Sequence, residues 1–264
     1  MDELLAAIAT KKEQLDRLRP LSQETLANLE HYYDIELTYT SNAIEGNTLS
    51  PVETTLVIEQ GVTIGGKPLK DHLEALDHYD AIRYVRELAR QTTRLTEGDV
   101  RNLHRLVVQR SRPDIAGRYA DLPRYVRTET GRHMFPSPAE IPALMGDFAA
   151  WLGTATGTPD TAFTAHRRVV DIHPFNDGNG RTARLLMNLI LIRAGYPPVA
   201  VRPEDRLDYI RSLQQAQEGL GTESFSRLLY KRLDATLDEY LSALQAEPPT
   251  EPKRDKTGGS DRRP

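Results

Sequence analysis

Apolar residues recur at the three- and four-residue spacing of amphipathic helices along most of the chain. Polar caps and prolines divide this pattern into segments with the lengths of ordinary globular helices. The first segment stops at Pro20, and Ser22 can cap the second. The apolar positions of these two predicted helices are Leu4, Ile8, Leu15 and Leu18, followed by Leu26, Leu29, Tyr33 and Leu37.

Capping residues mark the starts of three more predicted helices. Ser50 with Glu53, and Ser137 with Glu140, each combine a cap hydroxyl, a proline at the next position and a glutamate that can reach back to the cap. Thr96 begins the third. Further helices fit residues 160–171, 180–194, 204–217 and 222–244, and the sequence shows no internal repeat.

Residues 117–136 interrupt the helical pattern. Tyr125 and Val126 stand before a TETG turn, and Met134 and Phe135 stand after it. Short β-favouring runs on either side of a polar turn are typical of a hairpin. We therefore expect an all-α fold with one β-hairpin.

Composition narrows the classes of function. The 34 basic and 38 acidic residues give a net charge of −4, which argues against a dedicated nucleic-acid binder. The longest apolar run, 185–192, is too short to span a membrane, and the N-terminus lacks the pattern of a signal peptide. The chain has no cysteine, so thiol catalysis and cysteine-ligated zinc are excluded. We expect a cytoplasmic protein without a membrane partner.

The stretch HPFNDGNGRTAR, residues 173–184, concentrates polar chemistry. Gly178 and Gly180 permit close approach of a ligand to the backbone, and the helix that begins there presents unpaired N–H groups to an anion. Arg181 and Arg184 lie one turn apart on that helix, and their guanidinium groups suit phosphate oxygens. The pattern predicts a phosphate site at a helix start.

Two further residues of this stretch suggest catalysis. Asp177 could hold Mg²⁺, which prefers carboxylate and phosphate oxygens, and His173 could accept a proton near neutral pH. Taken singly, each of these residues has a plain structural interpretation as a buried histidine or a turn residue. Their occurrence together with the glycines and arginines favours a site with its own base and metal ligand.

At these residues the chain resembles the Fic family. HPFNDGNGRTAR matches the family signature, histidine-x-phenylalanine-x-acid-GNGR-x-x-R, at every position, and the resemblance covers most of the chain. It implies a Fic-type helical bundle with one β-hairpin flap, and an enzyme that transfers AMP from ATP to a protein hydroxyl. The roles it implies are His173 as base, Asp177 as metal ligand, Gly178, Asn179 and Gly180 as an anion hole, Arg181, Arg184 and Tyr209 at the nucleotide, and Tyr125, Val126 and Arg127 on a target-docking flap.

A second stretch, SNAIEG at 41–46, resembles the inhibitory motif of the family. It lies before the catalytic core, as in class II members. Ser41 and Glu45 are one helical turn apart and share a face. In the family such a glutamate pairs with the second arginine, here Arg184, and prevents productive seating of the γ-phosphate. The simpler alternative is a helix end with Gly46 as its cap and Glu45 in solvent.

Two positions depart from the family pattern. The flap often begins Tyr-Arg in relatives, whereas Tyr119 is followed here by Ala120, and the turn after Thr128 is longer than usual. Gln217 stands where relatives often place an asparagine near the adenosine. Target docking, which can proceed by strand addition with little sequence identity, is therefore the least defined part of the resemblance.

The resemblance divides the chain into residues 1–94, N-terminal helices with the inhibitory motif, and residues 95–245, a Fic core packed as one unit with them. The remainder, 246–264, is rich in proline and charge and is predicted to be disordered.

We expect an autoinhibited protein adenylyltransferase that modifies a Tyr, Thr or Ser hydroxyl of a protein target, uses ATP with Mg²⁺ or Mn²⁺, and releases pyrophosphate. Two alternatives stay open. One is removal of AMP at the same site with the help of Glu45, and the other is a nucleotide-binding regulatory module without turnover. A homodimer through the N-terminal helix is a further possibility.

Overall fold

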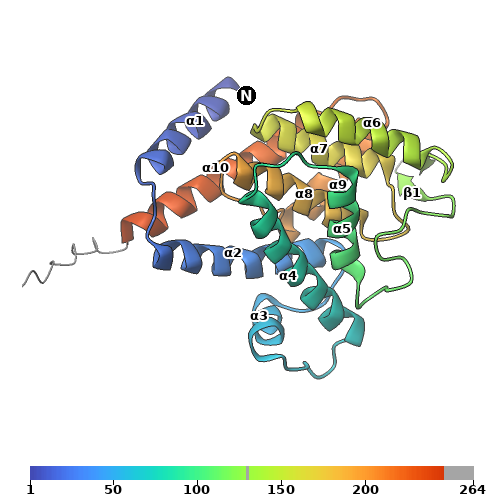
Figure 1. Cartoon of the computed structure of the whole chain (residues 1–264), viewed down its shortest axis with the longest axis horizontal. Coiled ribbons are helices and arrows are strands. Elements are labelled where there is room, and N and C mark those ends of the chain that lie inside the picture. The colour runs from blue at the N-terminus through green and yellow to red at the C-terminus, as the bar shows by residue number, and fades with distance from the viewer. Residues whose placement is uncertain (129–130, 247–264) are drawn as a thin grey trace, which may run out of the picture.

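Helix α8 (Asn179–Arg193) lies at the centre of the computed structural model, which describes residues 1–128 and 131–246 (Figure 1). Every residue from Arg181 to Leu191 of this helix is buried, so neighbouring elements cover it on all sides. The other helices of the described ranges are α1 (Asp2–Arg17), α2 (Gln23–Ile44), α3 (Pro51–Gln60), α4 (Leu69–Ala89), α5 (Glu97–Val108), α6 (Ile141–Thr154), α7 (Pro159–Ile172), α9 (Arg206–Gln217) and α10 (Glu223–Ala246), with one 3₁₀ turn at Pro203–Asp205. Of these, α2, α4, α5 and α7 pack directly on α8.

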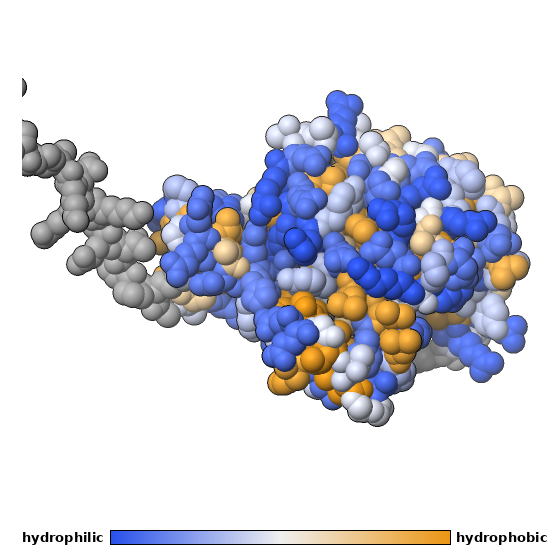
Figure 2. Space-filling model, turned by 60° about the horizontal axis from the view of Figure 1, so that its bottom comes forward, coloured by the Kyte–Doolittle hydropathy of each residue, from blue (hydrophilic) through white to orange (hydrophobic). Residues whose placement is uncertain are grey.

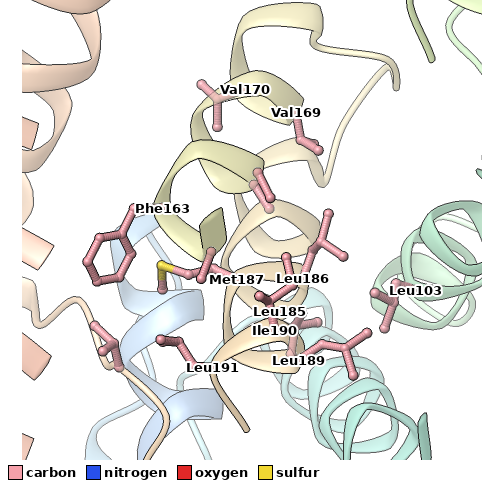
Figure 3. Close-up of a cluster of buried hydrophobic side chains, with 14 of the residues drawn as sticks. Leu103, Phe163, Val169, Val170, Leu185, Leu186, Met187, Leu189, Ile190 and Leu191 are labelled. Atoms are coloured by element: carbon pink, nitrogen blue, oxygen red, sulfur yellow. The ribbon is translucent and has the colours of Figure 1, made fainter. Parts of the chain in front are cut away.

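The core forms where α8 meets its neighbours. Figure 3 shows Leu185, Leu186 and Leu189 of α8 extending toward Leu103 of α5, with Phe163 of α7 on another side of the helix. All of these side chains are at most 2% exposed. The apolar run that could not span a membrane is therefore the centre of a helical bundle. No helix in the described ranges is long and apolar enough to cross a bilayer.

One β-hairpin completes the fold, as the sequence predicted. Strands β1 (Tyr125–Thr128) and β2 (Gly131–Met134) pair antiparallel, with Tyr125 opposite Met134 and Thr128 opposite Gly131. Phe135, predicted as a strand residue, lies just beyond β2. The all-α fold with a single hairpin is confirmed over the described residues.

The predicted helix starts at Ser22, Ser50 and Thr96 are confirmed, since each of these hydroxyls accepts a hydrogen bond from a backbone N–H of its helix. The start predicted at Ser137 is wrong. Glu140 does bind the Ser137 N–H, but helix α6 begins at Ile141. A helix from Pro138 would place Pro142 in its interior, where proline removes a hydrogen bond; a start at Ile141 leaves Pro142 in the first turn.

Helix α4 was not recognised from the sequence. Its inner face carries three buried acids, Asp71, Glu74 and Asp77, which obscure the apolar period. Asp77 is fully buried and accepts hydrogen bonds from the backbone N–H groups of Arg110 and Ser111, at 2.9–3.0 Å. These groups lie at the end of α5, so the acid fixes that helix against α4.

Helix α1 packs lengthwise on α10 (Figure 1). Its Ile8 and Leu15 are buried, and Lys11 Nζ lies 2.7 Å from Asp234 and 2.6 Å from Asp238. Two of the four apolar positions predicted for the N-terminal helix, Ile8 and Leu15, are thus covered within the chain, whereas Leu18 is 45% exposed. The predicted tail lies outside the described residues, apart from Ala246 at the end of α10.

The surface near α3 is the most apolar part of the face that Figure 2 shows. Figure 2 shows apolar side chains gathered over the part of the molecule formed by α3 and the start of α4. The exposed large residues there are Val52, Val62 and Leu69.

Asn188 ties α8 to the segment after it. Its side-chain Nδ2 donates to the Val199 carbonyl at 3.1 Å, and its Oδ1 accepts from the Val199 N–H at 2.7 Å. Asn188 therefore pairs with both peptide groups of Val199, as a neighbouring strand would. Both residues are at most 2% exposed, so these groups need a partner within the protein.

We expect Asn188→Ala to lower the free energy of unfolding by about 3 kcal/mol, because both peptide groups of Val199 would be left unpaired in the interior. Urea denaturation followed by circular dichroism measures this loss. The matched control is Leu220→Ala at a side chain that is 70% exposed, which should change stability by less than about 0.5 kcal/mol. Equal stability of the two variants would contradict the role given to Asn188.

Candidate active site

His173 ends helix α7 in an unusual backbone conformation. Its φ of 50° and ψ of 57° are left-handed, and its N–H donates to the Val169 carbonyl at 2.9 Å. The ring Nδ1 lies 3.3 Å from the Val170 carbonyl, which can only accept, so Nδ1 carries the proton and Nε2 is left as the basic atom. Burial lowers the pKa of His173 to about 4, so the ring is neutral at physiological pH.

The loop after His173 is held closed by Asn179. Its Oδ1 accepts from the Phe175 N–H at 2.9 Å, and its Nδ2 donates to the Phe175 carbonyl at 2.8 Å. The Asn179 side chain is thereby committed to the loop, and only its backbone N–H can meet an anion. No side chain of the described residues caps the start of α8, so this helix end suits an anion.

His104 of α5 supports the same loop from below. The Gly117 N–H donates to His104 Nδ1 at 3.0 Å, so the proton of this ring is on Nε2, which donates to the Asp177 carbonyl at 3.0 Å. Phe175, fully buried as expected of an anchor, stacks on His104 with ring centroids 3.7 Å apart. Gly178 adopts a φ of 77° directly above His104, where a Cβ would meet the ring at 3.4 Å.

Asp177 is placed to hold a metal together with a ligand. Its Oδ1 accepts from the Gly178 N–H at 2.6 Å, and Arg181 Nη2 lies 3.4 Å from the same oxygen. Oδ2 has Arg112 at 4.0 Å, and the side chain is 38% exposed. No group of three histidine or acidic side chains that could hold a metal occurs in the described part of the chain. A single accessible carboxylate fits Mg²⁺ only where phosphates and water complete the shell.

Arg184 joins the loop to helix α2. Its Nε donates to Ser41 Oγ at 2.9 Å, and Nη2 donates to the Ser41 carbonyl at 2.9 Å and to Glu45 Oε1 at 2.7 Å. The guanidinium is buried, whereas the Glu45 side chain is 39% exposed. The structure therefore brings together the two motifs that lie 139 residues apart along the chain.

Glu45 also lies directly over the glycine turn. A Cβ built on Gly180 would overlap Glu45 Oε1 and would approach Arg184 Nη1 to 3.0 Å. The carboxylate thus lies against Gly180, on the side where a Cβ of this residue would project. The Glu45 side chain is thus paired with Arg184 while 39% of it stays exposed to solvent, and Gly46 follows the helix end with a φ of 95°.

Tyr209 is buried behind Arg184. Arg184 Nη1 donates to the Tyr209 hydroxyl at 3.4 Å, and the hydroxyl donates to His166 Nε2 at 2.7 Å. Burial lowers the pKa of His166 to about 3, so this ring accepts as a neutral imidazole. The two residues form a neutral, hydrogen-bonded support for a buried cation.

Arg181 is directed away from Arg184, toward α4. Its Nη1 lies 3.1 Å from Glu74 Oε1, and both side chains are almost fully buried. Glu74 Oε2 accepts from Asn47 Nδ2 at 3.2 Å, so the residue two places after Glu45 shares the acid that holds Arg181. Each signature arginine therefore has an acidic partner from the N-terminal helices.

The end of α2 is fixed on two further sides. Arg206 of α9 donates from Nε to the Ile44 carbonyl at 2.8 Å. Thr48 N–H donates to the Asp71 carboxylate at 2.8 Å. Glu45 thus leaves a helix end that α4 and α9 hold in place, which limits how far its carboxylate can move without a larger change.

A cavity of about 280 Å³ opens beside these groups. It is bordered by the helix start and the hairpin, and its volume lies at the small end for ligand sites. The predicted site residues that line it are Glu45, Tyr125, Val126, His173, Gly180, Arg184 and Tyr209, with Gln217 beside them. The other predicted site residues, Ser41, Asp177, Gly178, Asn179 and Arg181, do not line this cavity. The Arg127 carbonyl accepts from Gln214 Nε2 at 3.1 Å.

Sequence reasoning missed Glu74, Asn47, His166 and Phe135 as parts of the site. Acids at 71, 74 and 77 repeat every three residues on one helix, which is a readable sign of a buried polar face. His166 has no such sign, because its contact with Tyr209 crosses 43 residues of sequence.

Known proteins resemble this chain in both sequence and structure. Residues 94–191 match the model of the Fic/DOC family. "Protein adenylyltransferase Fic" of Nematostella vectensis is 34% identical, over 92% of this chain and 61% of its own length. The structure of Fic-1 from C. elegans is 30% identical with a TM-score of 0.81, and the match covers 92% of this chain and 72% of that one.

A bacterial structure matches over nearly its whole length. The Fic domain containing signaling protein of Bacteroides thetaiotaomicron is 31% identical with a TM-score of 0.84, covering 92% of this chain and 98% of that protein. The chain spans about half the length of the curated relatives that it matches. With the family match over residues 94–191 and a structural match at 31% identity that covers 98% of the bacterial protein, this chain belongs to the Fic/DOC family.

Proposed function

We propose that this chain is a protein adenylyltransferase whose activity is restrained by Glu45. The observation that carries the proposal is a cavity lined at once by the neutral base His173, the Arg184 guanidinium and the start of α8. The naming of its relatives as protein adenylyltransferases supports the same reaction.

In this reaction the hydroxyl oxygen of a target Tyr, Thr or Ser attacks the α-phosphorus of ATP. The bond from that phosphorus to the bridging oxygen of the β-phosphate breaks, and pyrophosphate leaves. His173 Nε2 takes the proton of the hydroxyl, a role supported by its tautomer and by the neutral state of the ring at physiological pH. The N–H groups at the start of α8 and the arginines stabilise the charge that develops on the phosphate oxygens.

Asp177 would hold Mg²⁺ or Mn²⁺ in this scheme, and the ion would add positive charge at the phosphates. Tyr209 acts through Arg184, because its hydroxyl bonds that guanidinium. Tyr125, Val126 and Arg127 on β1 would dock an extended target segment by strand addition.

Glu45 restrains the reaction by competition. It neutralises Arg184 and stands over Gly180, where the phosphates must approach. This supports a class II arrangement, with the inhibitory helix before the core. A cytoplasmic location, the lack of a nucleic-acid partner and homodimer formation stay predictions from the sequence.

A second candidate, removal of AMP from a modified protein, rests on one observation. Glu45 and His173 line the same cavity, so the carboxylate could orient a water molecule toward a bound phosphate ester. A purely regulatory nucleotide-binding module is less favoured, since binding alone does not need a buried neutral base.

Release of Arg184 should activate the protein. We expect Glu45→Gly with ATP and Mg²⁺ to label itself or lysate proteins with AMP at least about tenfold faster than the wild type, the factor that corresponds to 1.4 kcal/mol of relieved competition. Adding His173→Ala should lower that rate by about 100-fold or more. Glu59→Ala, which removes an exposed carboxylate of α3, is the control. The proposal fails if Glu45→Gly labels nothing that Glu45→Gly with His173→Ala does not also label.

Asp177 should control the dependence on metal. In the Glu45→Gly background, we expect Asp177→Asn to raise the Mg²⁺ concentration needed for half-maximal labelling by about tenfold or more, because one of few protein ligands is lost. A chelator should abolish labelling by either protein. Glu13→Gln, which removes a 71% exposed acid of α1, should leave the requirement unchanged. An unchanged Mg²⁺ requirement in Asp177→Asn would exclude the assignment.

The direction of the reaction can be decided separately. A target labelled by the Glu45→Gly variant is purified and incubated with wild-type protein. Release of AMP that is lost in Glu45→Gly would favour the second candidate. We expect release to stay at the level of a buffer control if transfer is the principal activity.

A further inference from the structure

The catalytic geometry of His173 is not secured by its own hydrogen bonds. A left-handed conformation costs a non-glycine residue about 1–2 kcal/mol, and it persists where surrounding contacts impose it. His173 is the only non-glycine residue with positive φ among those described. The bond from Nδ1 to the Val170 carbonyl is long, at 3.3 Å, and leaves the ring free to tilt.

Phe135 supplies the missing contact. Its ring lies almost parallel to the His173 ring, with centroids 3.8 Å apart and an interplanar angle of 11°. Phe135 is 8% exposed, and it also meets His133 edge to face at 5.2 Å. One face of the basic imidazole is therefore covered by a flat apolar surface, which limits tilting and excludes water from that side.

Arg124 holds the segment that carries Phe135 at two points. The Phe135 N–H donates to the Arg124 carbonyl at 3.1 Å, and Arg124 Nη2 donates to the carbonyl of Pro136 at 2.6 Å. Arg124 Nη1 adds a bond to the Leu122 carbonyl at 3.3 Å. Arg124 is 9% exposed, and its guanidinium has no acidic partner within 4 Å in the described ranges. Its hydrogen bonds go to backbone carbonyl groups at the base of the hairpin.

We propose that Phe135, fixed by Arg124, is a positioning residue for His173, so that the hairpin predicted to dock the target also orients the base that deprotonates it. The proposal rests on the proposed role of His173 as the base. It explains why a charged residue is buried without a counter-ion at this position: the arginine closes the base of the hairpin by binding carbonyl oxygens on both of its sides.

The charged groups that act on His173 come from three directions. Arg124 at the hairpin opposes protonation of His173, whereas Glu45 at the end of α2 and Asp177 in the signature loop favour it, and burial is the largest influence on the pKa. Removing the Phe135 ring would expose the imidazole to water and raise its pKa toward the ordinary value of about 6.5.

The test uses the Glu45→Gly variant as parent and measures two independent quantities. Nuclear magnetic resonance of the His173 ring protons reports stacking, because an aromatic face shields them. The rate of AMP transfer at saturating ATP and the apparent KM for ATP report function. We expect Phe135→Leu to move the His173 signals downfield, raise the pKa of His173 and slow transfer by about tenfold or more, with KM for ATP changed less than twofold.

Three further variants complete the test. Phe135→Tyr keeps the ring and should restore both the shielding and at least half of the rate. Met134→Leu, at the neighbouring 57% exposed side chain, should leave the His173 signals in place. Arg124→Gln should act in the same direction as Phe135→Leu, and the double variant should be no worse than the more affected single one, because Arg124 acts through Phe135.

Unmoved His173 signals in Phe135→Leu would overturn the proposal, as would moved signals with an unchanged transfer rate. Additive losses in the double variant would remove Arg124 from it. If Phe135→Leu does not fold, shielded His173 signals in the parent and in Phe135→Tyr decide the stacking. A parent without any transfer activity would count against the proposed function alone, since the resonance measurement still determines whether Phe135 orients His173.

Discussion

The buried guanidinium of Arg184 is the constraint around which the molecule is arranged. A cation removed from water must be surrounded by acceptors, because an unpaired buried charge costs several kcal/mol. Ser41 and Glu45 of the α2 end and Tyr209 of α9 supply those acceptors. The N-terminal helices therefore cannot be displaced from the catalytic loop without a change in the environment of its arginine. The proposed restraint by Glu45 and the packing of the N-terminal helices on the loop therefore depend on the same bonds to Arg184.

Two stacked histidine–phenylalanine pairs hold the signature loop and its basic histidine. His104 and Phe175 set the position of the loop backbone, while Phe135 covers the basic ring of His173. Burial lowers the pKa of both histidines to about 4. Arginines therefore supply the positive charge of the resting site near neutral pH, whereas both histidine rings are neutral there, which leaves His173 able to accept a proton.

Local signals in the sequence predicted most of the helices, the hairpin and the signature loop. The contacts between segments far apart in the sequence could not be predicted from such signals. The caps at Ser22, Ser50 and Thr96, the hairpin and the signature loop are readable because each is encoded within a few residues. The pairing of Glu45 with Arg184 was inferred from a family resemblance, since no local rule connects residues so far apart. Phe135 was missed because a contact across the fold leaves no periodicity in either segment. Glu74 was missed although acids recur at 71, 74 and 77, because that repeat does not say which partner each acid binds. Helix α4 was missed for a related reason: the acids that it buries for other elements hide its own apolar face.

The bare glycine at position 180 has a further consequence. A turn without a side chain admits the oxygens of a triphosphate, and for the same reason it admits any other anion of similar size. The N–H groups of the turn alone do not distinguish ATP from a carboxylate. The relative concentration of the two anions at the turn therefore decides which one binds. Glu45 is covalently attached and held at a fixed helix end, which gives it an effective local concentration in the millimolar range or above, whereas nucleotide must arrive by diffusion. In the proposed restraint, the carboxylate and the nucleotide therefore compete for this site, and the length and stiffness of the segment that carries Glu45 determine how much nucleotide is needed to displace it.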